Sequence, residues 1–138
     1  MKIKILNTDY DLFLHNNFKE LNENAKKRDE RYALEPLKDF KPLDGYCDYT
    51  EKEIHIFVDK YTKRKYFEMT LYHELTHAFL YEIGYSNHDD EDLVDKISKW
   101  VPLITDLFNE SLGVIRNART SNKKGSKKND QQSIPDSK

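Results

Sequence analysis

The sequence predicts an α+β fold in which a small antiparallel sheet or hairpin packs on an apolar helix that is followed by a second long helix. Apolar residues alternate near the start of the chain and again within residues 45–58, as expected for strands. Residues 61–83 are rich in apolar side chains and contain neither Gly nor Pro before Gly84. Residues 89–112 then repeat apolar side chains at helical spacing.

The length and composition describe a single polar domain with a tail. A chain of 138 residues has the length of one domain, which we place at residues 1–116. Residues 117–138 lack apolar periodicity and are rich in Lys, Ser, Asn and Gln, so a disordered basic polar tail is expected there. The single cysteine, Cys47, and the lack of a signal-peptide pattern or a membrane-length apolar run predict a cytoplasmic protein.

The first 44 residues predict a strand and a helix. Residues 2–6 alternate with period two, and residues 7–9 interrupt that pattern. Residues 16–34 carry a thin apolar stripe among many charged side chains, which is typical of a mostly polar surface helix. Pro36 and Pro42 then bracket a connecting segment, because proline lacks an amide donor and restricts the residue before it.

Residues 45–49 and 53–58 predict a hairpin with a tight turn at residues 50–52. An open edge of such a hairpin can hold an extended peptide through main-chain hydrogen bonds. His55 is expected on the exposed strand face, with metal ligation as the less favoured alternative. Cys47 is interpreted in the same way, as a small apolar residue rather than a ligand.

The strongest chemical signal is the H-E-x-x-H motif of His73, Glu74 and His77. Residues four apart lie on one face of a helix, so both imidazoles can reach one ion. A catalytic zinc site uses three protein ligands and keeps one position open. Glu74 is placed to act as the general base beside such an ion. A polar His face without a metal is the alternative, but the apolar neighbours Leu71, Leu75, Ala78 and Phe79 predict a buried helix.

The third ligand must come from outside this helix, and the acidic start of the next helix is its natural source. Glu91 is the favoured residue, with Asp92, Asp95 and His88 as alternatives. Asp95 lies one turn after Glu91, so its carboxylate can reach back to the free ring nitrogen of a ligand His. Asp89 and Asp90 are interpreted as complements of the helix dipole. Pro102 should kink or divide this second helix.

HELTH followed by the Glu91–Asp95 arrangement resembles the gluzincin metallopeptidases, whose third ligand is a Glu in an E-x-x-x-D pattern on the next helix. With the preceding hairpin, residues 45–100 are similar to the ImmA/IrrE-like and related short zinc-peptidase-like proteins of phages and mobile elements. The resemblance implies a minimal zincin-like fold with Zn²⁺ held by His73, His77 and Glu91. It also implies Glu74 as the catalytic base.

These observations favour a zinc-dependent hydrolase that cleaves a peptide bond. The resemblance implies cleavage at one site in a regulatory protein of a phage or mobile element. Tyr81, Tyr85 and His88 are candidate donors to the developing oxyanion. The alternative is a catalytically silent zinc-fold protein that acts by contact with another protein. A third hypothesis, nucleic-acid association, depends on weak phosphate contact through the basic tail, and no membrane partner is expected. The sequence leaves the substrate and the oligomeric state open.

Overall fold

The computed structural model of the chain describes residues 1–33 and 39–126, and the chain divides into two units, Met1–Lys99 and Trp100–Lys138. The first unit holds the whole sheet together with helices α1 (Phe18–Tyr32) and α2 (Arg64–Glu82). Helix α3 (Glu91–Ser126) begins in the first unit and continues into the second. The α+β class predicted from the sequence is therefore confirmed.

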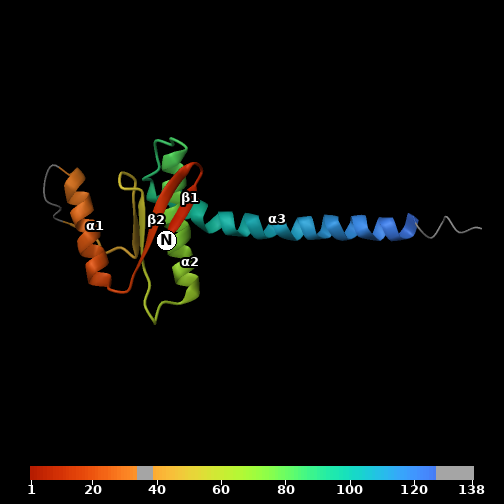
Figure 1. Cartoon of the computed structure of the whole chain (residues 1–138), viewed down its shortest axis with the longest axis horizontal. Coiled ribbons are helices and arrows are strands. Elements are labelled where there is room, and N and C mark those ends of the chain that lie inside the picture. Colours follow the sequence, from red (N-terminus) through yellow and green to blue (C-terminus); the bar gives the residue numbers. More distant parts are fainter. Residues whose placement is uncertain (34–38, 127–138) are drawn as a thin grey trace, which may run out of the picture. The chain divides into compact units, whose positions relative to one another are not determined.

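Four strands form one mixed sheet in the order β1-β2-β4-β3 (Figure 1). Their bounds are β1 (Lys2–Ile5), β2 (Thr8–His15), β3 (Gly45–Asp48) and β4 (Glu53–Phe57). Strands β3 and β4 form the predicted antiparallel hairpin. The prediction of an antiparallel sheet is wrong, because β2 pairs with β4 in parallel; β2 is an interior strand and β1 lies at the edge.

Strand β2 falls where the sequence predicts a break. Ile5 pairs with Thr8, so only Leu6 and Asn7 form the turn between β1 and β2. Leu6 has a φ of 54°, a left-handed conformation that is uncommon for a side chain of this kind. Two-residue hairpin turns usually contain Asn-Gly or Asp-Gly, and the Leu-Asn pair lacks that sequence signal.

One helix covers each face of the sheet. Helix α1 starts at the side-chain cap of Asn17, which accepts a hydrogen bond from the Glu20 amide at 3.1 Å. It buries Leu21 and Ala25 against the face that carries Tyr46. On the other face, a second apolar cluster packs beneath α2; it consists of Ile5, Tyr10, Cys47, Ile54, Ile56 and Ala78. The sheet is thus buried on both sides.

Helix α2 lies within the apolar stretch of residues 61–83 and ends as expected. Gly84 follows the C-cap with a φ of 74°, and the Tyr85 amide donates to the Leu80 carbonyl at 2.9 Å. Leu71, Leu75 and Ala78 pack on the sheet as predicted, but Phe79 is 45% exposed, so its predicted burial is wrong. The apolar run covers more of the helix circumference than the sheet can bury.

Asp90 directly precedes helix α3, and its side chain accepts a hydrogen bond from the Leu93 amide at 3.1 Å. The helix runs through Pro102 without division and includes residues 117–126, for which the sequence predicts disorder. Extending an existing helix adds one hydrogen bond per residue fixed, so it needs no apolar periodicity. Residues 127–138 of the predicted tail lie outside the described residues. None of the helices in the described part of the chain has the length and apolar content needed to cross a membrane.

Candidate metal centre

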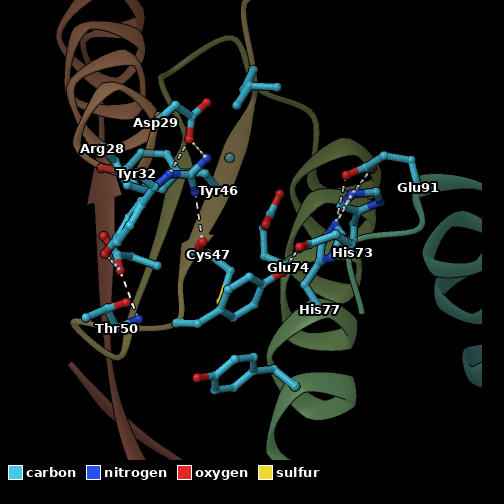
Figure 2. A pocket seen from close by; sticks show the side chains of 16 residues that line it. Arg28, Asp29, Tyr32, Tyr46, Cys47, Thr50, His73, Glu74, His77 and Glu91 are labelled. Atoms are coloured by element: carbon cyan, nitrogen blue, oxygen red, sulfur yellow. Dashed lines mark hydrogen bonds and ion pairs between the residues drawn. The ribbon is translucent and has the colours of Figure 1, made fainter. Parts of the chain in front are cut away.

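Three potential ligands meet where α2 faces the first turn of α3. His73 and His77 lie one turn apart on α2, with their Nε2 atoms 3.1 Å from each other. The Glu91 carboxylate lies opposite both rings, with Oε2 at 3.0 Å from His73 Nε2 and Oε1 at 3.2 Å from His77 Nε2 (Figure 2). These three residues could hold a metal ion, because one ligand atom from each lies within 4.8 Å of the others.

The outer nitrogens of both rings are engaged, which sets the tautomers. His77 Nδ1 lies 2.7 Å from the His88 carbonyl oxygen, which can only accept, so Nδ1 carries the proton. His73 Nδ1 lies 3.0 Å from Asp95 Oδ1, which gives the same assignment for an ionised carboxylate. Burial lowers the pKa of His77 and favours its neutral form. Both Nε2 atoms therefore point lone pairs at the space between the rings.

The donor set fits a zinc ion. Two imidazole lone pairs and a carboxylate repel each other at 3.0–3.2 Å unless a cation lies between them. Tetrahedral zinc with bonds of about 2.0–2.1 Å separates its ligand atoms by about 3.3 Å, close to the spacing found here. Imidazole nitrogen and carboxylate oxygen are both common zinc ligands. The geometry of the three side chains is thus already near that of a bound site, although it does not by itself select one metal.

Glu74 lies on the part of α2 that faces β3, next to the two His residues (Figure 2). It is 6% exposed, and no hydrogen bond to its carboxylate is found within the described residues. Burial raises the pKa of Glu74 to about 8, and the nearby Glu91 carboxylate acts in the same direction. A buried acid without a local partner is typical of functional sites, because a fold seldom tolerates its desolvation otherwise.

A glycine in β3 permits this close approach of α2 to the sheet. A Cβ added to Gly45 would lie 2.9 Å from the His55 carbonyl oxygen, 3.0 Å from Thr70 Cγ2 and 3.2 Å from Glu74 Cγ. These distances are shorter than ordinary contacts, so no larger residue fits without movement. Glycine inside a strand often marks such an approach, and this signal was present in the sequence.

The metal cluster, by which we mean the candidate ligands His73, His77 and Glu91, opens into a cleft of about 560 Å³. The cleft runs along β3 between α1 and α2. Strand β3 is an edge strand of the sheet. The Asp44 carbonyl accepts a hydrogen bond from the Phe57 amide, so the alternate residues Gly45 and Cys47 present their main-chain groups to the open side. Arg28 of α1 donates from Nη1 to the Cys47 carbonyl oxygen at 2.8 Å. One of the outward main-chain groups is therefore already paired.

Four tyrosines also line the cleft: Tyr32, Tyr46, Tyr49 and Tyr81. Only Tyr81 among them was a predicted oxyanion donor. Tyr49 was not singled out; its hydroxyl donates to Asp89 Oδ1 at 2.8 Å. Its ring stacks on Tyr81 with 4.7 Å between centroids. Nothing in the local sequence marks Tyr49, because its neighbours Tyr81 and Asp89 are distant along the chain.

The three alternatives to Glu91 as third ligand have different positions in the structure. Asp95 contacts His73 as expected, and Asp92 is exposed at the start of α3. His88 supplies its main-chain carbonyl to His77, while its ring packs edge-on against Tyr49 and Tyr81.

His55 lies on the α1 face of the sheet, away from the metal cluster. The prediction that it is exposed is wrong, because only 8% of it is accessible. Its ring stacks on Tyr46 and Phe13. Its two nitrogens lie 2.8 Å from His15 Nε2 and 2.9 Å from Glu53 Oε2. This pairing satisfies a polar ring inside the sheet face.

Comparison of the chain with protein-family models, with characterised proteins and with solved structures finds no match in any of the three. The interpretation of the site therefore depends on the motif and on the geometry of this chain.

Proposed function

We propose that the protein is a zinc-dependent peptidase with a minimal zincin-like fold, resembling the gluzincin and ImmA/IrrE-like metallopeptidases. The observation that carries this proposal is the convergence of His73, His77 and Glu91 beside the buried, unpartnered carboxylate of Glu74. A purely structural zinc site takes four protein ligands and needs no base. Three converging ligands and an adjacent acid support a hydrolytic role instead.

His73, His77 and Glu91 would hold the ion, with Asp95 and the His88 carbonyl keeping the two rings in place. Zinc, when bound there, supplies a Lewis acid that polarises a carbonyl oxygen and makes water easier to deprotonate. Glu74 accepts the proton from the attacking water at its carboxylate and then donates it to the leaving amine. The burial that raises the pKa of Glu74 suits this second, acidic role, while a nearby cation favours the ionised form needed first.

The substrate in this proposal is an extended peptide that lies along β3. Gly45 and the Cys47 amide face the open side of the strand and can pair with the main chain of an added strand. The cleft beside them provides aromatic surface from tyrosine side chains. Main-chain pairing supplies affinity for any sequence, so selectivity must come from the side chains of the cleft.

The biological role that fits this chemistry is cleavage of a regulatory protein, as the resemblance to phage and mobile-element proteins suggests. A cytoplasmic location and the absence of a membrane partner belong to the same proposal. Phosphate contact by the basic C-terminal segment is a minor addition to it.

Metal content and cleavage of a proteome-derived peptide mixture, read by mass spectrometry, test the proposal. The parent protein should carry near-stoichiometric zinc, and His77→Ala should lose it. Glu74→Gln should keep zinc and the fold but cut peptides about 10²–10⁴-fold more slowly, because it removes only the base. Glu68→Gln is the matched control: it makes the same change on α2, at a side chain that pairs with Arg64.

A parent protein without zinc would overturn the metal site. Zinc in the parent together with equal cleavage by Glu74→Gln would overturn the role of the base. Zinc binding without any cleavage by the parent would support the contact-only alternative. Glu91→Gln should weaken zinc retention; undiminished retention would move the third ligand to Asp92, Asp95 or His88.

A further inference from the structure

The second unit carries a broad apolar face on α3. Seven large apolar side chains between Trp100 and Ile115 are 52–66% exposed: Trp100, Leu103, Ile104, Leu107, Phe108, Val114 and Ile115. At 100° per residue they occupy one side of the helix, and Pro102, Asn109 and Arg116 lie on the other. Charged residues make up 35% of the chain, enough to cover a solvated helix on all sides, so this one-sided placement indicates an interface.

The centre of this face follows a coiled-coil repeat. Successive steps of four and three residues connect Trp100, Ile104, Leu107, Ser111, Val114 and Ala118. Such alternation averages 3.5 residues and keeps one seam towards a partner helix. Pro102 falls at the position farthest from the seam, where it does not obstruct a partner.

We propose that the partner is a second copy of this chain, paired antiparallel through the same α3 seam. Antiparallel pairing places Trp100 opposite Ala118, Ile104 opposite Val114, and Leu107 opposite Ser111 of the other copy. Each large side chain then meets a smaller one, the arrangement that fills space between two helices. The self-complementarity makes the interface isologous, as a two-fold dimer requires.

Parallel pairing of the same seam is less favourable. It would place Trp100 against Trp100 of the other copy, and Ser111 and Ala118 against their own equivalents. The contact between the two Trp100 side chains would be overcrowded. The contacts at Ser111 and Ala118 would leave unfilled space between the helices, with a loss of packing energy.

The exposed area suffices for a specific dimer. If each of the seven side chains contributes roughly 100 Å² of exposed apolar surface, the face offers on the order of 700 Å². Two such faces would bury about 1,400 Å² in total, within the range of about 1,200–2,000 Å² that specific interfaces bury. The pairing is independent of the proposed peptidase activity, because no metal ligand belongs to the seam.

Sedimentation velocity of the full chain at micromolar concentration tests the pairing. The parent should sediment as a dimer. Leu107→Glu should raise the dissociation constant more than about tenfold, because it buries a charge without a partner in the seam. Asn109→Glu is the matched control on the opposite side of the same helix turn and should remain dimeric. Circular dichroism should show that both variants keep the helix content of the parent.

Disulfide formation between copies tests the orientation. After oxidation of a mixture of Ile104→Cys and Val114→Cys chains, mixed disulfides should outnumber those between identical chains. Cys47 is buried, so it should not compete. A monomeric parent, or a dimer unaffected by Leu107→Glu, would overturn the proposed seam. Equal loss of the dimer in both Glu variants would do the same, and an excess of identical-chain disulfides would overturn the antiparallel orientation.

Discussion

Gly45 couples the sheet to the candidate site at the scale of a single residue. The glycine lies against the Cγ atom of Glu74 and against the Thr70 methyl group of α2. A side chain at this position would have to move α2 or β3, and α2 also carries His73 and His77. The positions of His73 and His77 therefore depend on the absence of a side chain at Gly45.

Gly45→Ala should destabilise the protein by about 1–3 kcal/mol, the usual cost of overpacking a tight contact. It should also weaken zinc binding, because the displaced helix carries two of the proposed ligands. Urea unfolding and zinc titration measure the two effects. Gly113→Ala is the control: apart from its own stretch of helix, nothing in the described part of the chain lies within 4 Å of the added Cβ. The substitution should stabilise α3 by up to about 1 kcal/mol. Equal behaviour of the two variants would contradict the role given to Gly45.

The sequence predicts those residues of the candidate site whose relation depends only on spacing along a helix. His73, Glu74 and His77 are defined by helical spacing. The Glu91–Asp95 spacing predicted a contact between Asp95 and one of the two His residues, and the contact is with His73. The cleft residues were not predictable in this way. Arg28 and Tyr49 reach the cleft from α1 and from the end of β3, and their roles depend on contacts between distant segments.

At the scale of elements, the last residue of α2 joins the helix to two parts of the sheet. Glu82 accepts hydrogen bonds from Thr8 and Tyr10 of β2, each at 2.7 Å, and from Lys52 in the β3–β4 turn at 2.6 Å. Burial raises the pKa of Glu82, but these bonds lower it more, and the pKa falls to about 2. The ionised carboxylate thus holds α2 to the sheet.

This contact predicts that the free energy of unfolding falls at acidic pH. Because the pKa of Glu82 is lowered on folding, its contribution is full above the ordinary value of 4.5 and is lost as the pH falls to about 2. Near neutral pH, Glu82→Gln should cost on the order of 1–3 kcal/mol, as expected for hydrogen bonds to a charged group. Urea unfolding of both proteins across this range should show the difference shrinking on acidification. Glu51→Gln, in the exposed turn, should give little difference at any pH.

The elements themselves were predicted from periodicity and caps, except for strand β2 and the part of α3 beyond residue 116. Helices α1 and α2 and the β3–β4 hairpin follow from apolar spacing, and Gly84 ends α2 as expected. Strand β2 was missed because Asn7, Thr8 and Asp9 favour a turn by composition. Tertiary pairing with both β1 and β4 overrides that preference.

At the scale of the whole molecule, the first unit contains both core clusters and every residue of the metal cluster. A chain that ends after Lys99 should therefore fold and bind zinc as the full chain does, and it should be monomeric because the seam is removed. Calorimetric melting, zinc analysis and sedimentation check the three expectations. Loss of folding or zinc in the shortened chain would show that the first unit needs residues beyond Lys99.

The parallel pairing of β2 with β4 also has a consequence for the order of folding. Each hairpin forms from neighbouring residues, but Asp11 must find Glu53 about 40 positions later along the chain. Closing that loop is the entropically costly step. The two hairpins should therefore form early, and the pairing of β2 with β4 should form late. During synthesis, β2 must wait on the ribosome until β4 has emerged.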